Sequence, residues 1–255
     1  MSQNDMKSTE RFSNRVDDYV KYRPGYPEGV MNCLKTQYQL KPQHRIADVG
    51  SGTGISAELF LKNGNWVFGV EPNKEMREGS EQFLHAYSQF ETVNGTSENT
   101  TLKDHSVDFI VAAQAFHWFD PLPTKIEFRR IMKPGGRIVI LFNNRRMEGN
   151  SFSLQYEQLL NEFGTDYKKV KQQNVTAEKL RQFFSAYKTH NFINTQSFDE
   201  AGLMGRVRSS SYMPVPGHPR FPELEKRVHE LFLKCQKQGL VTMEYNTEMH
   251  ISEAL

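Results

Sequence analysis

A short apolar run that leads into three evenly spaced glycines restricts the fold of this chain more than any other feature. Residues Arg45–Val49 read RIADV and are followed by Gly50, Gly52 and Gly54. A short apolar run bounded by glycines is typical of a buried strand, and glycines in the turn after a strand let the backbone approach a ligand closely. The stretch therefore predicts a strand, a tight ligand-binding turn and a helix that begins near Ile55.

The central part of the chain alternates short apolar runs with amphipathic helical patterns. A parallel sheet covered on both faces has this pattern in its sequence. We predict strands at residues 45–49, 66–70, 90–93, 107–113, 137–142, 191–198 and 241–251. Helices are predicted at 55–63, 74–88, 122–132 and 223–238, and from Pro27 through Tyr38. This order predicts an α/β fold built on a doubly wound sheet.

The length of 255 residues is sufficient for one globular domain with an insertion. Residues 143–190 are polar, contain scattered aromatic side chains and are too numerous for a plain loop between two strands. We therefore expect a single domain in which residues 12–142 form a cofactor-binding core. Residues 143–190 are expected to form a helical insertion or lid, and residues 191–255 to complete the sheet.

Charge and cysteine content argue against several classes of function. Lysine and arginine total 32 against 30 aspartates and glutamates, and a net charge of +2 gives no electrostatic reason to expect nucleic acid or a membrane as partner. The only cysteines, Cys33 and Cys235, have no neighbours at metal-ligand spacing, so we expect neither a metal nor a disulfide. The apolar stretches are too short to cross a bilayer, and the first residues show no apolar leader pattern. We expect a cytoplasmic enzyme that acts on a small molecule.

Two acidic residues at the ends of consecutive predicted strands indicate which ligand the glycines serve. A dinucleotide fingerprint, G-x-G-x-x-G/A, needs glycine or alanine at position 55, where this chain has Ile55. Asp48 would also repel a pyrophosphate, because nearby like charges cost about 4 kcal/mol at an effective dielectric constant near 20. Glu71 ends the next predicted strand, where a carboxylate can accept hydrogen bonds from both hydroxyls of a ribose.

Together the two acids predict a nucleoside that is positively charged and has no phosphates, a description that S-adenosylmethionine meets. Each acid alone has a simpler explanation, because Asp48 could cap the turn and Glu71 could be a solvated acid at the start of a helix. Their placement on consecutive strand ends favours the functional interpretation.

Four motifs carry a resemblance to a known family. They are IADVGSGTG, VEPNKEM, VNGTSENTTLKDHSVDFIVAAQAFHWFD and IMKPGGRIVI. In this order and spacing they resemble class I S-adenosylmethionine-dependent methyltransferases, and more narrowly the type 11 group that includes trans-aconitate methyltransferase-like enzymes. The resemblance covers about residues 12–142, with a looser likeness in SSSYMP and YNTEMHI. It implies a Rossmann-like sheet, mostly parallel with an antiparallel last strand, together with a helical lid insertion.

The resemblance also implies which residues hold the cofactor. Asp48 is expected near its ammonium group, and Glu71 at its ribose hydroxyls. Arg23, in the segment that resembles Y-x-x-x-R-P-x-Y-P, is expected to pair with the cofactor carboxylate, and Tyr19 to close over it. The other implied contacts are Gly50, Gly52, Thr53 and Gly54 at the methionine part, Pro72, Asn73, Met76, Ser97 and Glu98 around the adenine, and Ala113, Gln114 and Ala115 near the amino acid moiety. Core packing is the alternative explanation for Tyr19 and Met76.

The acceptor is less constrained by the sequence. A carboxylate acceptor is already nucleophilic and needs no base, whereas for a hydroxyl, an amine or a carbon acid His117 is the candidate base, with a structural histidine as the alternative. Guanidinium groups suit anionic substrates, and four arginines near or beyond the expected lid are candidates, with surface charge as the alternative for each. These four are Arg145, Arg146, Arg206 and Arg208. The hypothesis is a small organic acceptor, conceivably a carboxylic acid.

Three other functions compete with this interpretation. A nicotinamide-dependent reductase shares the layout of strand, glycine turn, helix and acid, but Ile55 and Asp48 argue against it. A non-catalytic protein that binds S-adenosylmethionine would have the same cofactor residues without turnover. Methylation of nucleic acid is disfavoured by the charge balance and by the lack of an Asn-Pro-Pro-aromatic motif.

Overall fold

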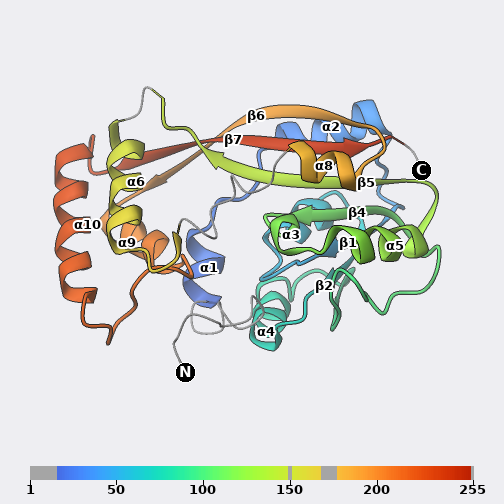
Figure 1. Cartoon of the computed structure of the whole chain (residues 1–255), viewed down its shortest axis with the longest axis horizontal. Helices are drawn as coiled ribbons and strands as arrows, with labels where there is room; N and C mark the ends of the chain where they lie inside the picture. Colours follow the sequence, from blue (N-terminus) through green and yellow to red (C-terminus); the bar gives the residue numbers. More distant parts are fainter. Residues whose placement is uncertain (1–15, 149–150, 168–176, 254–255) are drawn as a thin grey trace.

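One seven-stranded sheet runs through the part of the chain that the computed structural model describes, residues 16–148, 151–167 and 177–253 (Figure 1). Its strands are β1 (Arg45–Val49), β2 (Trp66–Val70), β3 (Phe90–Val93), β4 (Val107–Ala113), β5 (Met132–Arg145), β6 (Tyr187–Phe198) and β7 (Val241–Ser252). The helices are α1 (Val16–Tyr22), α2 (Glu28–Tyr38), α3 (Ile55–Leu61), α4 (Lys74–Phe83), α5 (Pro121–Ile131), α6 (Ser151–Phe163), α8 (Ala177–Phe183), α9 (Glu200–Arg208) and α10 (Phe221–Cys235), with a short 3₁₀ helix, η3 (Phe116–Trp118).

The strand order, β3-β2-β1-β4-β5-β7-β6, confirms the predicted doubly wound sheet. The pairings from β3 to β5 are parallel, and β7 runs antiparallel to both β5 and β6, as the antiparallel last strand was expected to do. The chain moves outward from β1 to β3 and then crosses back to β4 on the other side of β1. A crevice opens at the carboxyl ends of the strands where the order reverses in this way, here β1 and β4.

The first four predicted strands coincide with β1 to β4, and the later boundaries differ for local reasons. The strand predicted at 137–142 is too short, because β5 begins at Met132, which pairs with Val107. The ladder then shifts in register around Gly135, whose φ is +80°, and resumes at Arg137. The turn expected from the Pro-Gly-Gly sequence is therefore an irregularity inside a longer strand.

The insertion predicted at 143–190 is wrong at both ends. β5 continues to Arg145 and β6 begins at Tyr187, so both ends of this segment belong to the sheet. The middle contains α6 and α8, as the helical prediction expected. The sequence concealed the start of β6 because it is an edge strand with mostly polar, partly exposed side chains.

Alternate side chains of the strands pack against opposite helical layers. One face of the central strands, with Ile46 and Val111 among its residues, packs on α2, α3 and α4. The other face, with Ala47 and Ile110, packs on α5 and α8. This burial on both faces explains why these strands read as continuous apolar runs.

A third apolar cluster lies at the far end of the two antiparallel strands. It combines α6, α9 and α10 with the first residues of β7, and includes Tyr156, Leu203, Val228 and Tyr245. Figure 1 shows these three helices beyond the parallel part of the sheet, with α1 lying between them and α4. No helix in the described ranges is both long and apolar enough to cross a membrane.

Candidate active site

The glycine turn lies at the carboxyl end of β1. Gly50 has a φ of +70°, and a Cβ at this position would lie 2.6 Å from the Cβ of Ala115. Gly52 has a φ of +54°, but a Cβ there would meet only the Cε of Met76, at 3.6 Å. The backbone at Gly52 therefore has open space beside it, where a ligand can approach.

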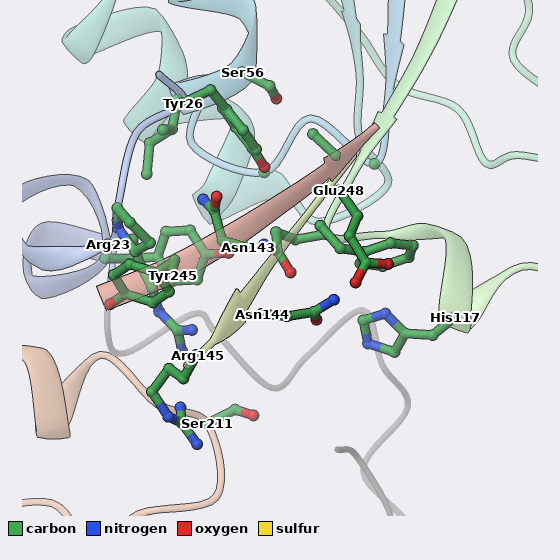
Figure 2. A pocket seen from close by; sticks show the side chains of 18 of the residues that line it. Arg23, Tyr26, Ser56, His117, Asn143, Asn144, Arg145, Ser211, Tyr245 and Glu248 are labelled. Atoms are coloured by element: carbon green, nitrogen blue, oxygen red, sulfur yellow. The ribbon is translucent and has the colours of Figure 1, made fainter. Parts of the chain in front are cut away.

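Two adjoining cavities lie along this edge of the sheet. The smaller, of about 240 Å³, lies beside the ends of β1, β2 and β4, and the larger, of about 390 Å³, extends to the end of β5 and the middle of β7 (Figure 2). Both are lined by Tyr19, Gly50, Gly52, Ala113, Gln114 and Trp118. Because they share these residues, one elongated ligand can occupy the smaller cavity and reach into the larger.

The smaller cavity brings together the residues expected around the nucleoside. Besides the shared residues, it is lined by Glu71, Pro72, Asn73, Met76, Ser97, Glu98 and Ala115. The carboxylate of Glu71 accepts hydrogen bonds from the N–H of Gly52 at 3.0 Å and from the N–H of Asn73 at 2.9 Å. Burial raises the pKa of Glu71, and these two bonds oppose the shift. The carboxylate is thus fixed in orientation and keeps acceptor capacity for hydroxyl donors.

Two of the expected contacts do not reach either cavity. Asp48 is fully buried, and its Oδ2 accepts a hydrogen bond from the hydroxyl of Ser56 at 2.6 Å. Since Ser56 lines the larger cavity, its side chain separates Asp48 from that cavity. Asp48 can therefore act on a bound ligand only through the electrostatic field of its charge. Gly54 is the N-cap of α3, and a Cβ there would lie 2.5 Å from the Cδ1 of Leu84. Its role is therefore the geometry of the turn.

Gln114 combines backbone strain with an unpaired polar atom. Its φ of +59° lies in the left-handed region, which is uncommon for a residue other than glycine and tends to mark functional sites. Its Oε1 is buried and has no hydrogen-bond partner among the described residues. Tyr26, which the sequence analysis did not single out, adjoins it: burial raises the pKa of Tyr26 well above 10, and a hydrogen bond with Gln114 opposes this.

His117 lines the larger cavity from η3. Its Nδ1 is buried without a partner among the described residues, and its backbone oxygen accepts a hydrogen bond from Lys179 of α8 at 3.2 Å. Burial, and then the charge of Lys179, lower the pKa of His117 to about 4. The imidazole is therefore neutral at physiological pH and available as a hydrogen-bond acceptor.

Three guanidinium groups, of Arg23, Arg145 and Arg206, line the larger cavity, and the Nε of each is buried without a hydrogen-bond partner in the described structure. Arg145 forms an ion pair with Glu157 at 2.6 Å. Arg206 is 3% exposed and reaches only serine hydroxyls, that of Ser210 at 3.3 Å, and Arg23 donates to the backbone oxygen of Ser209 at 2.9 Å. Neither has a carboxylate partner within the described ranges.

The four candidate arginines divide into two pairs. Arg145 and Arg206 line the cavity, which overturns the surface interpretation for both. Arg146 is half-exposed, 3.5 Å from a carboxylate oxygen of Glu244, and Arg208 forms an ion pair with Asp18 at 2.9 Å, so neither lines a cavity. Further lining residues that the sequence analysis did not assign are Asn143, Asn144, Glu157, Tyr167, Ser211, Tyr212, Tyr245 and Glu248. Only Ser211 and Tyr212, in SSSYMP, and Tyr245 and Glu248, in YNTEMHI, had a sequence signal.

The sheet order, the glycine turn after β1 and the acid after β2 are those of a class I S-adenosylmethionine-dependent methyltransferase. Residues 47–140 match the family model described as Methyltransferase domain, of type 11, and this part of the chain is such a domain. The match supports S-adenosylmethionine as the cofactor over the nicotinamide dinucleotide considered above.

Several curated relatives match the same kind of domain. An uncharacterized methyltransferase of Mycobacterium tuberculosis is 34% identical over 134 residues, and an uncharacterized methyltransferase-like protein of Schizosaccharomyces pombe is 27% identical over 135 residues. Each alignment covers 52% of this chain and 52% of the relative, so the chain spans about half the length of the curated relatives it matches.

Solved structures share the fold over most of the chain. A putative type II methyltransferase of Anaeromyxobacter dehalogenans has a TM-score of 0.62 and 16% identity, covering 91% of this chain and 98% of its own. A phosphoethanolamine N-methyltransferase 2 of Haemonchus contortus in complex with S-adenosyl-L-methionine has a TM-score of 0.57 and 13% identity, covering 100% of this chain and 61% of its own. At these identities the likeness establishes the fold alone.

Proposed function

We propose that this chain transfers the methyl group of S-adenosylmethionine to a small acceptor that carries a carboxylate. The cofactor follows from the family, and the acceptor is inferred from the larger cavity. One observation carries the inference: Arg206 is 3% exposed, lines the cavity and has no carboxylate partner within the described ranges. A buried charge without a counter-ion is costly, so a site of this kind fits an anionic ligand.

The residues at the turn fit the cofactor. Glu71 would accept the ribose hydroxyls, the unpaired Oε1 of Gln114 is suited to the ammonium group, and Arg23, beside Tyr19, is suited to the carboxylate. When bound, S-adenosylmethionine supplies a methyl group on a sulfonium sulfur: the acceptor's lone pair forms the new bond to carbon while the electrons of the carbon–sulfur bond remain on sulfur. The charge on sulfur is neutralised as the bond breaks, and the protein's part is to align the groups and exclude water.

His117 is proposed to orient the acceptor through its neutral imidazole. With a pKa of about 4 it is too weak a base to remove a proton from an ordinary hydroxyl, which fits an acceptor that is nucleophilic without a base. We expect the ratio of the wild-type rate to the rate of His117→Gln to change little between pH 6 and 8, since the imidazole stays neutral throughout this interval. A steady-state pH profile of the wild type and of His117→Gln tests this, and a rise of the wild-type rate with an apparent pKa near 6.5 that the variant lacks would contradict it.

Binding of the cofactor is tested first, by calorimetry with S-adenosylmethionine and S-adenosylhomocysteine. Glu71→Ala should weaken binding roughly tenfold to a hundredfold, because a charged hydrogen bond is worth about 1.5–3 kcal/mol. Glu91→Ala, which removes an exposed carboxylate from the neighbouring strand β3, is the matched control and should bind like the wild type. Equal affinity of the Glu71 variant and the wild type would show that the ribose does not bind at Glu71.

The acceptor is then sought by mass spectrometry with a panel of small carboxylic acids and with amines and phenols that have no acid group. Methylation confined to acceptors with a carboxylate is the expected result. Methylation only of acceptors without one would overturn the acceptor proposal, and cofactor binding without any turnover would favour the non-catalytic alternative.

A further inference from the structure

The three cavity arginines need more negative charge than the described residues and the cofactor supply. Two carboxylates line the larger cavity, and one of them, Glu157, is bonded to Arg145 and to the hydroxyl of Tyr167, each at 2.6 Å. The other, Glu248, is near His250 at 3.6 Å and is hydrogen-bonded to Asn144. The charges of Arg23 and Arg206 are therefore left uncompensated in the described structure.

The three charges act on one another and on a shared phenol. Burial, and then the charge of Arg206, lower the pKa of Arg23. Burial raises the pKa of Tyr212, but Arg145, Arg23 and Arg206 lower it by more, so the net shift is downward. Tyr212 and the three guanidinium groups line the same cavity, and a single cofactor carboxylate at Arg23 leaves the charge of Arg206 unmatched.

Arg145 belongs to a part of the cavity distant from the glycine turn. In Figure 2 Ser56, which follows the turn, lies near the top of the view, and Arg145 lies below Asn143, in the lower left part. Arg206 lies on α9, in the helical cluster beyond the parallel strands. Arg206 and Arg23 share the hydroxyl of Ser210, at 3.3 and 3.5 Å, so a group bound by Arg145 and Arg206 lies next to the cofactor's carboxylate end, on the side of the helical cluster.

We infer that Arg206 and Arg145 form an anion subsite for a group of the acceptor that keeps its charge throughout the reaction. The inference rests on the proposed function and deepens it. A carboxylate that becomes a methyl ester loses its charge, which would leave a buried guanidinium unmatched in the product complex. The acceptor is then a bifunctional acid: one anionic group is bound at the arginines, and a second nucleophilic group takes the methyl.

The test uses simple probes on the full chain saturated with S-adenosylhomocysteine, so that the Arg23 end is occupied. Glutarate, its monomethyl ester and its dimethyl ester are compared by thermal unfolding and calorimetry at low ionic strength. Glutarate and its monomethyl ester should both raise the Tm of the wild type and bind with similar Kd, because one negative charge is sufficient to occupy the proposed subsite. The neutral diester should do neither.

Arg206→Met should weaken binding of monomethyl glutarate at least tenfold. Without any anion its Tm should be higher than that of the wild type by a few degrees, because the variant removes an uncompensated buried charge. Arg206→Lys keeps the positive charge but lacks the paired N–H donors of a guanidinium group, so it should bind monomethyl glutarate with intermediate affinity. Arg146→Met, at the half-exposed arginine next to Arg145, is the matched control and should respond to the anions like the wild type.

The inference is overturned if neither glutarate nor its monoester stabilises the wild type, if only the dianion does, or if Arg206→Met responds to the monoester like the wild type. A merely structural role for Arg206 would lower Tm in the variant and leave the response to the anion unchanged. Failure of S-adenosylhomocysteine to bind would count against the proposed function instead, so the two failures are distinguishable.

Discussion

Asp48 is a fully buried carboxyl group whose ionisation the fold opposes. Burial raises its pKa from 3.8 to about 7, and the hydrogen bond from Ser56 opposes the shift. The unfolded chain releases this proton near pH 4 and the folded chain near pH 7. The stability of the fold therefore decreases as pH rises through this interval, and the loss is complete above about pH 7.

Asp48→Asn should remove this dependence, since the amide stays neutral and its oxygen can still accept from Ser56. Relative to the wild type, its free energy of unfolding should rise from near equality at pH 4 to an advantage of about 4 kcal/mol at pH 8. Urea unfolding of both proteins without cofactor, at a series of pH values, measures the difference in their free energies of unfolding. The contributions of groups that titrate in both proteins, such as His117, drop out of this difference. A difference that is constant with pH would contradict the assignment.

Most residues that line the smaller cavity could be predicted from the sequence because a local pattern fixes where they lie. Glu71 follows an apolar run that has to be a buried strand, and its place at the end of that strand puts it beside the glycine turn. The acceptor side has no such pattern. Nothing local distinguishes Arg145 from Arg146 or Arg206 from Arg208, because which one is buried depends on how the helices beyond the sheet pack.

At the level of elements, α1 is held against α9 by close packing. A Cβ added at Gly205 of α9 would overlap the ring of Tyr22 at the end of α1. The ion pair between Asp18 and Arg208 joins the same two helices. Since α1 carries Tyr19, which lines both cavities, the contact fixes one wall of these cavities.

Gly205→Ala should therefore weaken S-adenosylhomocysteine binding severalfold and lower the free energy of unfolding, although alanine is about 1 kcal/mol better than glycine inside a helix. Gly202→Ala in the same helix is the control. A Cβ there would lie 3.0 Å from the Oδ1 of Asp199, which is closer than an ordinary contact but can be relieved by a small movement of that side chain. The affinity of Gly202→Ala for S-adenosylhomocysteine should therefore stay within twofold of the wild type. Calorimetry and urea unfolding measure both effects, and equal affinities of the two variants would show that α1 does not shape the site.

The elements themselves were predictable where burial was continuous. The bounds of β1 to β4 were predicted from the sequence, whereas of β6 only residues 191–198 were, because the polar residues that begin this edge strand lack the apolar run that signals a core strand. The helix predicted at 74–88 ends five residues early, at Phe83, because the chain continues in turns, with the N–H of Tyr87 bonded to the oxygen of Leu84. α1 and α9 are short and were not predicted, and they owe their stability to each other's packing.

Over the whole molecule, the cavities lie between a cofactor-binding body and a helical cluster with a separate apolar core. Ligands at the two ends should therefore stabilise different parts of the chain. In hydrogen exchange, S-adenosylhomocysteine alone should protect the turn after β1, and monomethyl glutarate added to it should extend protection to α9 and residues 209–213. Full protection of α9 by S-adenosylhomocysteine alone would argue that the two ends respond as one unit.

β6 and β7, twelve residues each, connect these two regions. The family model ends at residue 140, before most of the residues that form the acceptor end. Helices attached to the far end of a long antiparallel pair can be exchanged or resized while the turn after β1 stays in place, provided that the contact between α9 and α1 is kept. Chains that share the matched region can thus diverge in what they methylate while retaining the same donor, so acceptor identity should be sought by comparing residues 145–235 between relatives.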